Sequence, residues 1–186
     1  ITNNKIEKIN FEKLKKPYFI AEIGGNHTGE KKIALEGIRN AKMSGANCVK
    51  FQMYRAEDLI IKTMPIMKHV KSIGKERFQY ERFKKLEINE TDVKDYYRAC
   101  AKVKIQLSVT PFYEDCVEFL SRYVSFFKIA SGDINYFRLI EKISKFNKPV
   151  VVSTGMSSEK EIEEKLKILK RNQVILLHCV SCYPTM

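Results

Sequence analysis

The chain has 186 residues, of which 44% are hydrophobic and 30% are charged, a composition that excludes disordered proteins and is typical of one globular domain. No run approaches the roughly 20 apolar residues that a membrane-spanning helix needs, so we expect no membrane partner. The formal net charge is +12, but the lysines are scattered among glutamates, which argues against a nucleic-acid partner and favours attraction of a small anion.

Six short apolar runs alternate with amphipathic stretches along the chain. Each run is nearly continuous in apolar residues, as strands buried on both faces of a parallel sheet are. The predicted strands cover residues 18–23, 48–52, 105–109, 126–129, 150–153 and 174–179. Apolar residues recur at helical spacing within 33–41, 117–120 and 162–169, and Ser158 with Glu161 forms a capping box that predicts the start of the last helix.

A long basic segment, residues 53–89, interrupts this alternation because it is only weakly periodic. A loop of that length after a strand is usually functional or mobile. We interpret the segment as a lid or an oligomer contact beside the site, with a plain insertion as the alternative.

The alternation of strands with helices predicts an α/β fold, either a doubly wound sheet or a barrel. Nearly every predicted strand is followed by a polar or charged side chain, and functional groups spread over all strand ends are what the catalytic face of a barrel requires. We therefore predict a (β/α)8 TIM-barrel type fold, of which this chain holds about six βα units where a closed barrel has eight.

Two lysines, Lys50 and Lys128, lie inside or at the end of apolar strands. Lysine is seldom fully buried without a partner, and no acidic residue alternates with either lysine along its strand. A bound anion would supply the missing negative charge. The alternative is that the stems are buried and the ammonium groups reach solvent.

Hydroxyl groups follow the strands near these lysines. Thr110, Ser131 and Ser153 each lie between a strand and a helix, where hydroxyls and backbone N–H groups can face a phosphate, although each is also an ordinary turn or cap residue. Beside two lysines, they describe a pocket for a substrate that carries both a carboxylate and a phosphate. At the end of the first strand, Glu22 suits acid–base work or hydroxyl binding, and Asn26 either contacts substrate or caps the next helix.

The five cysteines are odd in number and lie in or beside apolar runs. This usage predicts buried free thiols in a reducing, cytoplasmic compartment rather than a secreted disulfide framework. Cys179 and Cys182 have the C-x-x-C spacing of metal and redox sites. There is no second pair, however, and the first cysteine ends a strand, so we expect neither metal nor disulfide chemistry there.

Together, these motifs resemble the sialic acid synthase family, which makes N-acetylneuraminate and related nine-carbon acids. They match in order and spacing over almost the whole chain. The matching strings are AEIGGNHTG at 21–29, VKFQ at 49–52, TPF at 110–112, KIASGD at 128–133, STGM at 153–156 and HCVSCYPT at 178–185.

The resemblance implies an enzyme that condenses phosphoenolpyruvate with an N-acylated amino sugar aldehyde, N-acetylmannosamine or a related sugar, to give a nonulosonic acid and phosphate. The enol carbon attacks the aldehyde, water adds to the resulting oxocarbenium carbon, and phosphate leaves. Lys50 and Lys128 would hold the phosphoenolpyruvate carboxylate. The implied phosphate contacts are Thr110, Ser131, Ser153 and Ser181, and the residues implied to face the sugar are Glu22, Gln52, Asp133 and Tyr183, with Glu22 and Asp133 counted as catalytic beside the two lysines.

The resemblance also implies features that lie outside this chain. In the family, a divalent metal, Mn or Mg, is bound by two histidines on the seventh and eighth strands, so we assign no metal ligand here. Residues 1–186 are expected to be the N-terminal part of the barrel domain, without its last two βα units and without the C-terminal antifreeze-like domain of a full-length homodimer. We expect such a fragment to be inactive alone. Asp133 and Ser181 stand where some members have Glu and Asn, which leaves the identity of the sugar open.

Two other functions stay open at this point. A Schiff-base aldolase on the same fold would use Lys128 as its nucleophile, whereas a catalytically inactive module would only bind an anion. Borohydride trapping of a covalent lysine adduct with pyruvate would support the first.

Overall fold

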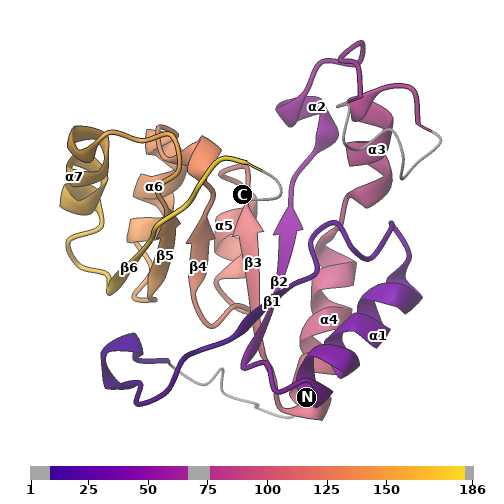
Figure 1. Cartoon of the computed structure of the whole chain (residues 1–186), viewed down its shortest axis with the longest axis horizontal. Coiled ribbons are helices and arrows are strands. Elements are labelled where there is room, and N and C mark those ends of the chain that lie inside the picture. The colour runs from indigo at the N-terminus through magenta and orange to yellow at the C-terminus, as the bar shows by residue number, and fades with distance from the viewer. Residues whose placement is uncertain (1–8, 67–75, 183–186) are drawn as a thin grey trace.

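The computed structural model describes residues 9–66 and 76–182. Within these residues, six strands form one sheet in which neighbouring strands run parallel and follow one another in chain order (Figure 1). The sheet curls into half of a barrel, which confirms the predicted α/β fold of TIM-barrel type. The strands are β1 (Ile20–Glu22), β2 (Cys48–Met53), β3 (Gln106–Pro111), β4 (Phe127–Ile129), β5 (Val150–Ser153) and β6 (Val174–Leu177).

Helices lie between the strands, and the predicted capping box begins the last of them. The backbone N–H of Glu161 donates to Oγ of Ser158 at 3.3 Å, and the carboxylate of Glu161 accepts from the backbone N–H of Ser158 at 2.8 Å. None of the helices in the described ranges has the length and apolar character that crossing a bilayer requires. The helices are α1 (Lys31–Met43), α2 (Ala56–Leu59), α3 (Gln79–Leu86), α4 (Glu90–Val103), α5 (Cys116–Leu120), α6 (Phe137–Ser144) and α7 (Glu159–Ile168).

The last strand is shorter than its apolar run predicts, since β6 ends at Leu177 rather than at residue 179. Beyond Leu177 the chain makes local contacts: the backbone N–H of Cys182 donates to the carbonyl of Val180 at 2.8 Å, and Sγ of Cys179 donates to the carbonyl of Leu177 at 3.5 Å. The strand ends where its partner ends, because Leu177 is paired with Ser153, the last residue of β5.

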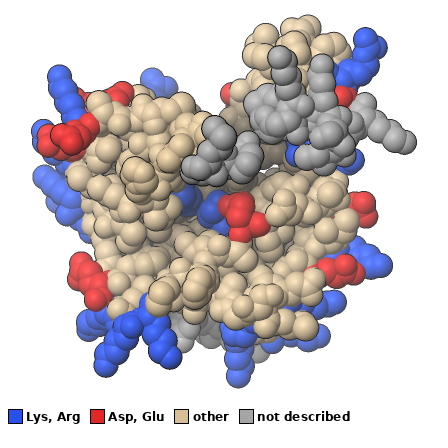
Figure 2. Space-filling model, viewed as in Figure 1, with Lys and Arg blue, Asp and Glu red and all other residues tan. Residues whose placement is uncertain are grey.

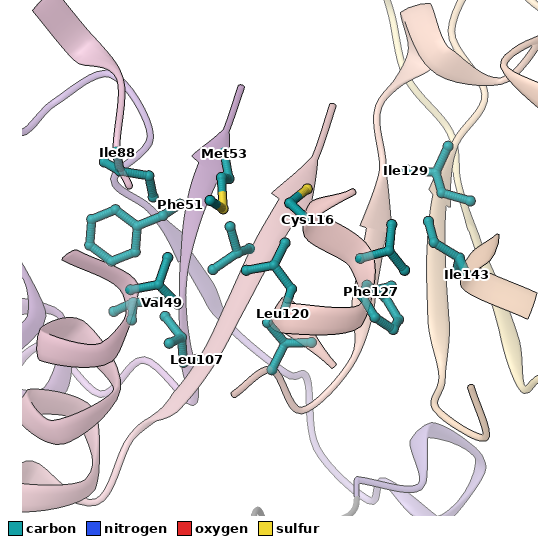
Figure 3. Close-up of a cluster of buried hydrophobic side chains, with 14 of the residues drawn as sticks. Val49, Phe51, Met53, Ile88, Leu107, Cys116, Leu120, Phe127, Ile129 and Ile143 are labelled. Carbon is teal, nitrogen blue, oxygen red and sulfur yellow. The ribbon is translucent and has the colours of Figure 1, made fainter. Parts of the chain in front are cut away.

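The main hydrophobic core lies between the outer face of the sheet and the helices. Val49 and Phe51 of β2 point to this side, where they belong to the same buried cluster as Leu120 of α5 and Ile143 of α6 (Figure 3). Side chains alternate between the two faces of a strand, so Lys50, which lies between Val49 and Phe51, points to the inner face. The outer core therefore decides which side chains reach the inside of the half-barrel.

A smaller apolar cluster fills the inner face near the amino ends of the strands. Cys48, Phe126 and Val151 form it, and Phe11 and Tyr18 from the N-terminal segment pack against it. The rings of Phe11, Tyr18 and Phe126 meet edge to face, with centroids 5.4 to 6.4 Å apart. Since this end is closed by apolar side chains, the polar groups of the inner face are left at the carboxyl ends of the strands.

The basic segment 53–89 contains the short helices α2 and α3, which lie beyond the carboxyl end of β2 (Figure 1). An antiparallel bridge between Pro65 and Phe78 and an ion pair between Lys84 and Glu57, at 2.9 Å, join its two halves. Residues 67–75 of this segment lie outside the described residues. The predicted role as a lid or an oligomer contact stays a prediction.

Candidate active site

A pocket of about 600 Å³ opens on the inner face of the half-barrel, at the carboxyl ends of the strands. Figure 2 shows basic and acidic side chains next to one another in the hollowed middle of the molecule. Eight of the predicted site residues line the pocket, because each lies in a strand or within a few residues of a strand's carboxyl end. They are Glu22, Lys50, Gln52, Thr110, Lys128, Ser131, Ser153 and Ser181.

Lys128 is the most buried charged group in this wall, with only 7% of its surface exposed. Its ammonium group donates to the carbonyl of Ile129 and to Oγ of Ser153, both at 2.6 Å. Burial is the main reason why the pKa of Lys128 falls to about 8, and repulsion from Lys50 lowers it further. Both acceptors are neutral, so among the described residues one N–H of the ammonium group is left for an anion.

Lys50 corrects one expectation from the sequence, namely that only a bound anion could supply its negative partner. Its ammonium group forms an ion pair with the carboxylate of Glu22. The pattern along β2 does not reveal this partner because Glu22 lies on the neighbouring strand, where the register pairs it with Lys50. The second carboxylate oxygen of Glu22 accepts a hydrogen bond from the N–H of Gly24 at 2.8 Å. Glu22 is thus held by a cation.

Hydroxyl groups also line the pocket. Oγ of Ser131 accepts from the N–H of Gly155 at 3.2 Å, and a Cβ at Gly155 would lie only 2.8 Å from Oγ of Ser181 and 3.0 Å from Oγ of Ser131. The absence of a side chain at Gly155 therefore leaves room for the hydroxyls of Ser131 and Ser181 to lie near each other. Oγ1 of Thr110 is buried and has no hydrogen-bond partner among the described residues, an arrangement that costs free energy unless a ligand or water contacts it.

Two predicted site residues that the structure describes, Asp133 and Asn26, do not line the pocket. Asp133 lies in the 3-10 turn Ser131–Asp133, where burial raises the pKa of its carboxyl to about 6 although the charge of Lys128 opposes this. Asn26 is exposed and its amide donates to the carbonyl of Glu22 at 3.3 Å. The alternative that Asn26 caps the next helix is wrong, because the N-cap of α1 is Glu30. Tyr183 lies outside the described residues.

The pocket also contains residues that the sequence does not single out as substrate contacts. Cys179 is a free thiol in the wall. Burial alone would raise its pKa, but hydrogen bonding with Ser153 and Thr154 and the charge of Lys128 outweigh burial, so the pKa is lowered. Its position directly after β6 is the signal that could have identified it. The other additional residues are Phe112, Ala130, Gly132, Met156 and Val180.

Three cysteines, Cys48, Cys100 and Cys116, are buried in the apolar clusters and are free thiols, as predicted. Burial raises the pKa of all three, in Cys100 and Cys116 to about 12. Thiols of this kind stay protonated and unreactive at neutral pH. The prediction of burial is wrong for Cys179, which is half-buried, and for Cys182, which is exposed, because both lie beyond the end of β6 rather than within a strand.

Metal-binding side chains do not gather in the part of the chain that the structure describes: no group of three His, Cys, Asp or Glu residues there could hold an ion. These residues therefore do not fit the divalent metal that the family resemblance implies. The metal stays a prediction for residues beyond those described.

Comparisons with known proteins show which family and fold the chain resembles. The model of the NeuB family matches residues 37–186. An uncharacterised protein of Methanocaldococcus jannaschii is 40% identical over 172 residues, which are 90% of this chain and 47% of that protein. The N,N'-diacetyllegionaminic acid synthase of Campylobacter jejuni is 36% identical over 178 residues, 92% of this chain and 53% of that protein. The structure of an N-acetylneuraminic acid synthetase from Leptospira borgpetersenii matches with a TM-score of 0.78 and 30% identity, over 97% of this chain and 61% of that one.

The chain spans about half the length of the curated relatives it matches. The relatives confirm the resemblance to sialic acid synthases that the motifs predict, and the structural match confirms the barrel type of the fold. By its sequence and by its half-barrel of parallel strands, the chain belongs to the NeuB family.

Proposed function

We propose that the complete protein carrying this chain condenses phosphoenolpyruvate with an N-acylated amino sugar aldehyde, N-acetylmannosamine or a related sugar, to give a nonulosonic acid and phosphate. The observation that carries the proposal is the meeting of two lysines from different strands, Lys50 and Lys128, in one pocket with hydroxyl groups from the neighbouring strand ends. The names of the relatives, which are synthases of such acids, support the same reaction.

The pocket offers complementary groups to the two anionic parts of phosphoenolpyruvate. In this proposal the ammonium groups of Lys50 and Lys128 bind the carboxylate. The phosphate is bound by the hydroxyls of Thr110, Ser131, Ser153 and Ser181, which line the same pocket. The buried Thr110 hydroxyl supports this assignment, because it has no partner among the described residues and a phosphate oxygen would satisfy it.

The sugar aldehyde would then lie on the side of Glu22 and Gln52, which share the pocket with the lysines. Asn26, Asp133 and Tyr183 remain proposed sugar contacts. C3 of phosphoenolpyruvate forms the new bond to the aldehyde carbon, and the aldehyde oxygen takes up a proton. Water then adds to C2, which carries the positive charge, and loses a proton. The C2–O bond to phosphate then breaks. Fixed charges and donors that hold both reactants in line would account for most of the rate.

A divalent metal, Mn or Mg, would assist by polarising the aldehyde carbonyl. We propose that its ligands lie outside the described residues, together with the rest of the barrel. A homodimer in the cytoplasm is part of the same proposal, and no step above depends on either.

The proposal can be tested on the complete gene product with phosphoenolpyruvate that carries ¹⁸O in its bridging oxygen. We expect release of phosphate that contains the label, strictly dependent on an N-acylated mannosamine-type aldehyde, and a product heavier than the sugar by one pyruvate unit. Unlabelled phosphate would indicate attack at phosphorus and contradict the reaction. No release with any such sugar from a folded, metal-loaded protein would favour an inactive anion-binding module.

A second candidate is a Schiff-base aldolase, and one observation favours it. The pKa of Lys128 is lowered to about 8, so part of the amine is neutral at physiological pH, as a nucleophilic lysine requires. Borohydride reduction in the presence of pyruvate distinguishes the two candidates. A covalent adduct on Lys128 would support the aldolase, whereas an unmodified lysine would support the condensation.

A further inference from the structure

We infer that Glu22 competes with an anionic ligand for Lys50, so that binding of the anion releases Glu22 for the second substrate. The inference rests on the proposed function, because that function places a carboxylate of the first substrate at Lys50. It goes further in assigning to Glu22 a control over the order and the strength of binding.

The competition follows from the way in which Glu22 is held. The register of β1 and β2 pairs Glu22 with Lys50, and the ammonium group contacts one carboxylate oxygen. The other oxygen accepts from the N–H of Gly24 at 2.8 Å. A Cβ at Gly24 would lie 2.5 Å from that oxygen and 2.8 Å from the side chain of Gln52, so a glycine is needed for the carboxylate to lie against Lys50.

The two members of the ion pair differ in their freedom to move. The side chain of Lys50 is 14% exposed, whereas that of Glu22 is 45% exposed. Lys50 is fixed in the strand wall, and Glu22 lies at the open side of the pocket. A ligand that takes the ammonium group is therefore expected to displace the carboxylate rather than the lysine.

The second lysine of the pocket shows a different arrangement. Lys128 donates to two neutral oxygens, the carbonyl of Ile129 and the hydroxyl of Ser153, and no ion pair to it is found among the described residues. An anion can approach Lys128 without displacing a negative group, but the approach to Lys50 brings it against Glu22. Competition is thus specific to one of the two lysines.

Two carboxylates at one ammonium group repel each other, and a partly buried setting screens this repulsion less than water does. Once displaced, Glu22 can accept hydrogen bonds from hydroxyls of the sugar, which the proposed function places on the same side. Binding of the anion should therefore strengthen binding of the sugar. Thermodynamic linkage requires the reverse effect to be of equal size.

The test uses the complete gene product and the variant Glu22→Gln, in which the amide keeps the volume and the acceptor for Gly24 but loses the charge. We expect phosphoenolpyruvate to bind up to about fivefold more tightly to this variant, because a half-exposed ion pair contributes about 0.2–1 kcal/mol. Asp115→Asn is the matched control, because this exposed carboxylate follows β3 and lies outside the pocket wall. In a Lys50→Met background, Glu22→Gln should strengthen binding less than it does in the wild-type protein, because the competition for Lys50 is gone and only the direct repulsion between the two carboxylates remains.

Isothermal titration separates the possible outcomes. If the wild-type protein binds no phosphoenolpyruvate, the proposed function and this inference both fail. If it binds, but Glu22→Gln binds equally well or more weakly, the inference fails and the proposed function stands.

If Glu22→Gln does not fold, a measurement on the wild-type protein tests the competition instead. The alditol of N-acetylmannosamine lacks the aldehyde and cannot react, so its affinity can be compared with and without saturating phosphoenolpyruvate. We expect several-fold tighter binding with the anion present, whereas unchanged or weaker binding would overturn the inference.

Discussion

Replacement of Lys128 by Met in the complete protein should weaken phosphoenolpyruvate binding much more than sugar binding. Lys128 is 7% exposed and lies in a strand wall, and Met keeps most of its volume while removing the ammonium group. The two hydrogen bonds that Lys128 makes, to Ile129 and Ser153 at 2.6 Å, keep the ammonium group oriented. The variant therefore removes a positioned charge from a pocket that otherwise keeps its shape.

The expected magnitude follows from the one N–H of the Lys128 ammonium group that has no acceptor among the described residues. A hydrogen bond to a charged group contributes about 1.5–3 kcal/mol, which corresponds to roughly 10- to 150-fold in affinity at about 1.4 kcal/mol per tenfold. The fold itself should survive, because the charge is buried against neutral acceptors and its loss removes a desolvation cost. Arg is not a useful alternative, since its planar fork cannot occupy the same point.

Isothermal titration of phosphoenolpyruvate into the wild-type protein and the variant measures the effect, with circular dichroism as the check on folding. Lys165→Met is the matched control. Lys165 is a lysine with only 2% exposure, but it lies on α7 against the ring of Phe137 and is not part of the pocket. If the folded Lys128 variant binds phosphoenolpyruvate normally but no longer turns over, Lys128 does not bind the carboxylate, and the Schiff-base reaction becomes the better explanation.

Three further predictions follow from the same geometry. Since the pKa of Lys128 is about 8, phosphoenolpyruvate affinity should be nearly constant below that pH and fall by up to about tenfold per pH unit above it; titrations between pH 7 and 9.5 that show a flat profile would contradict this. Gly155→Ala should weaken phosphoenolpyruvate binding about threefold to tenfold, because the new Cβ would lie 2.8 Å from Oγ of Ser181 and 3.0 Å from Oγ of Ser131. Isothermal titration of phosphoenolpyruvate into Gly155→Ala and into the wild-type protein measures this loss of affinity. Equal affinities would rule out Ser131 and Ser181 as phosphate contacts. The three buried cysteines should react with a thiol reagent only after denaturation, whereas Cys179 should react in the native protein and be protected by phosphoenolpyruvate; rapid native labelling of all four, followed by peptide mass analysis, would argue against the packing described above.

The strands and the inward direction of the functional side chains could be predicted from the sequence. Parallel strands that are buried on both faces must be nearly continuous in apolar residues, so a polar residue such as Lys128 within one is conspicuous, and strand parity assigns it to a face. Strand boundaries were less well determined. β6 ends earlier than its apolar run because its partner β5 ends at Ser153, which pairs with Leu177, and periodicity along one segment contains no information about the length of its neighbour.

The residue types at the strand ends also predicted that polar groups gather in one pocket, since parallel strands bring all their carboxyl ends to one edge. Only the tertiary structure decided which of these groups contact one another. The ion pair between Lys50 and Glu22 depends on the lateral register of β1 against β2, and the entry of Cys179 into the pocket depends on the bend after β6. Register and bends are set by packing between segments far apart in the chain, whereas a pattern along one segment reports only on that segment's own faces.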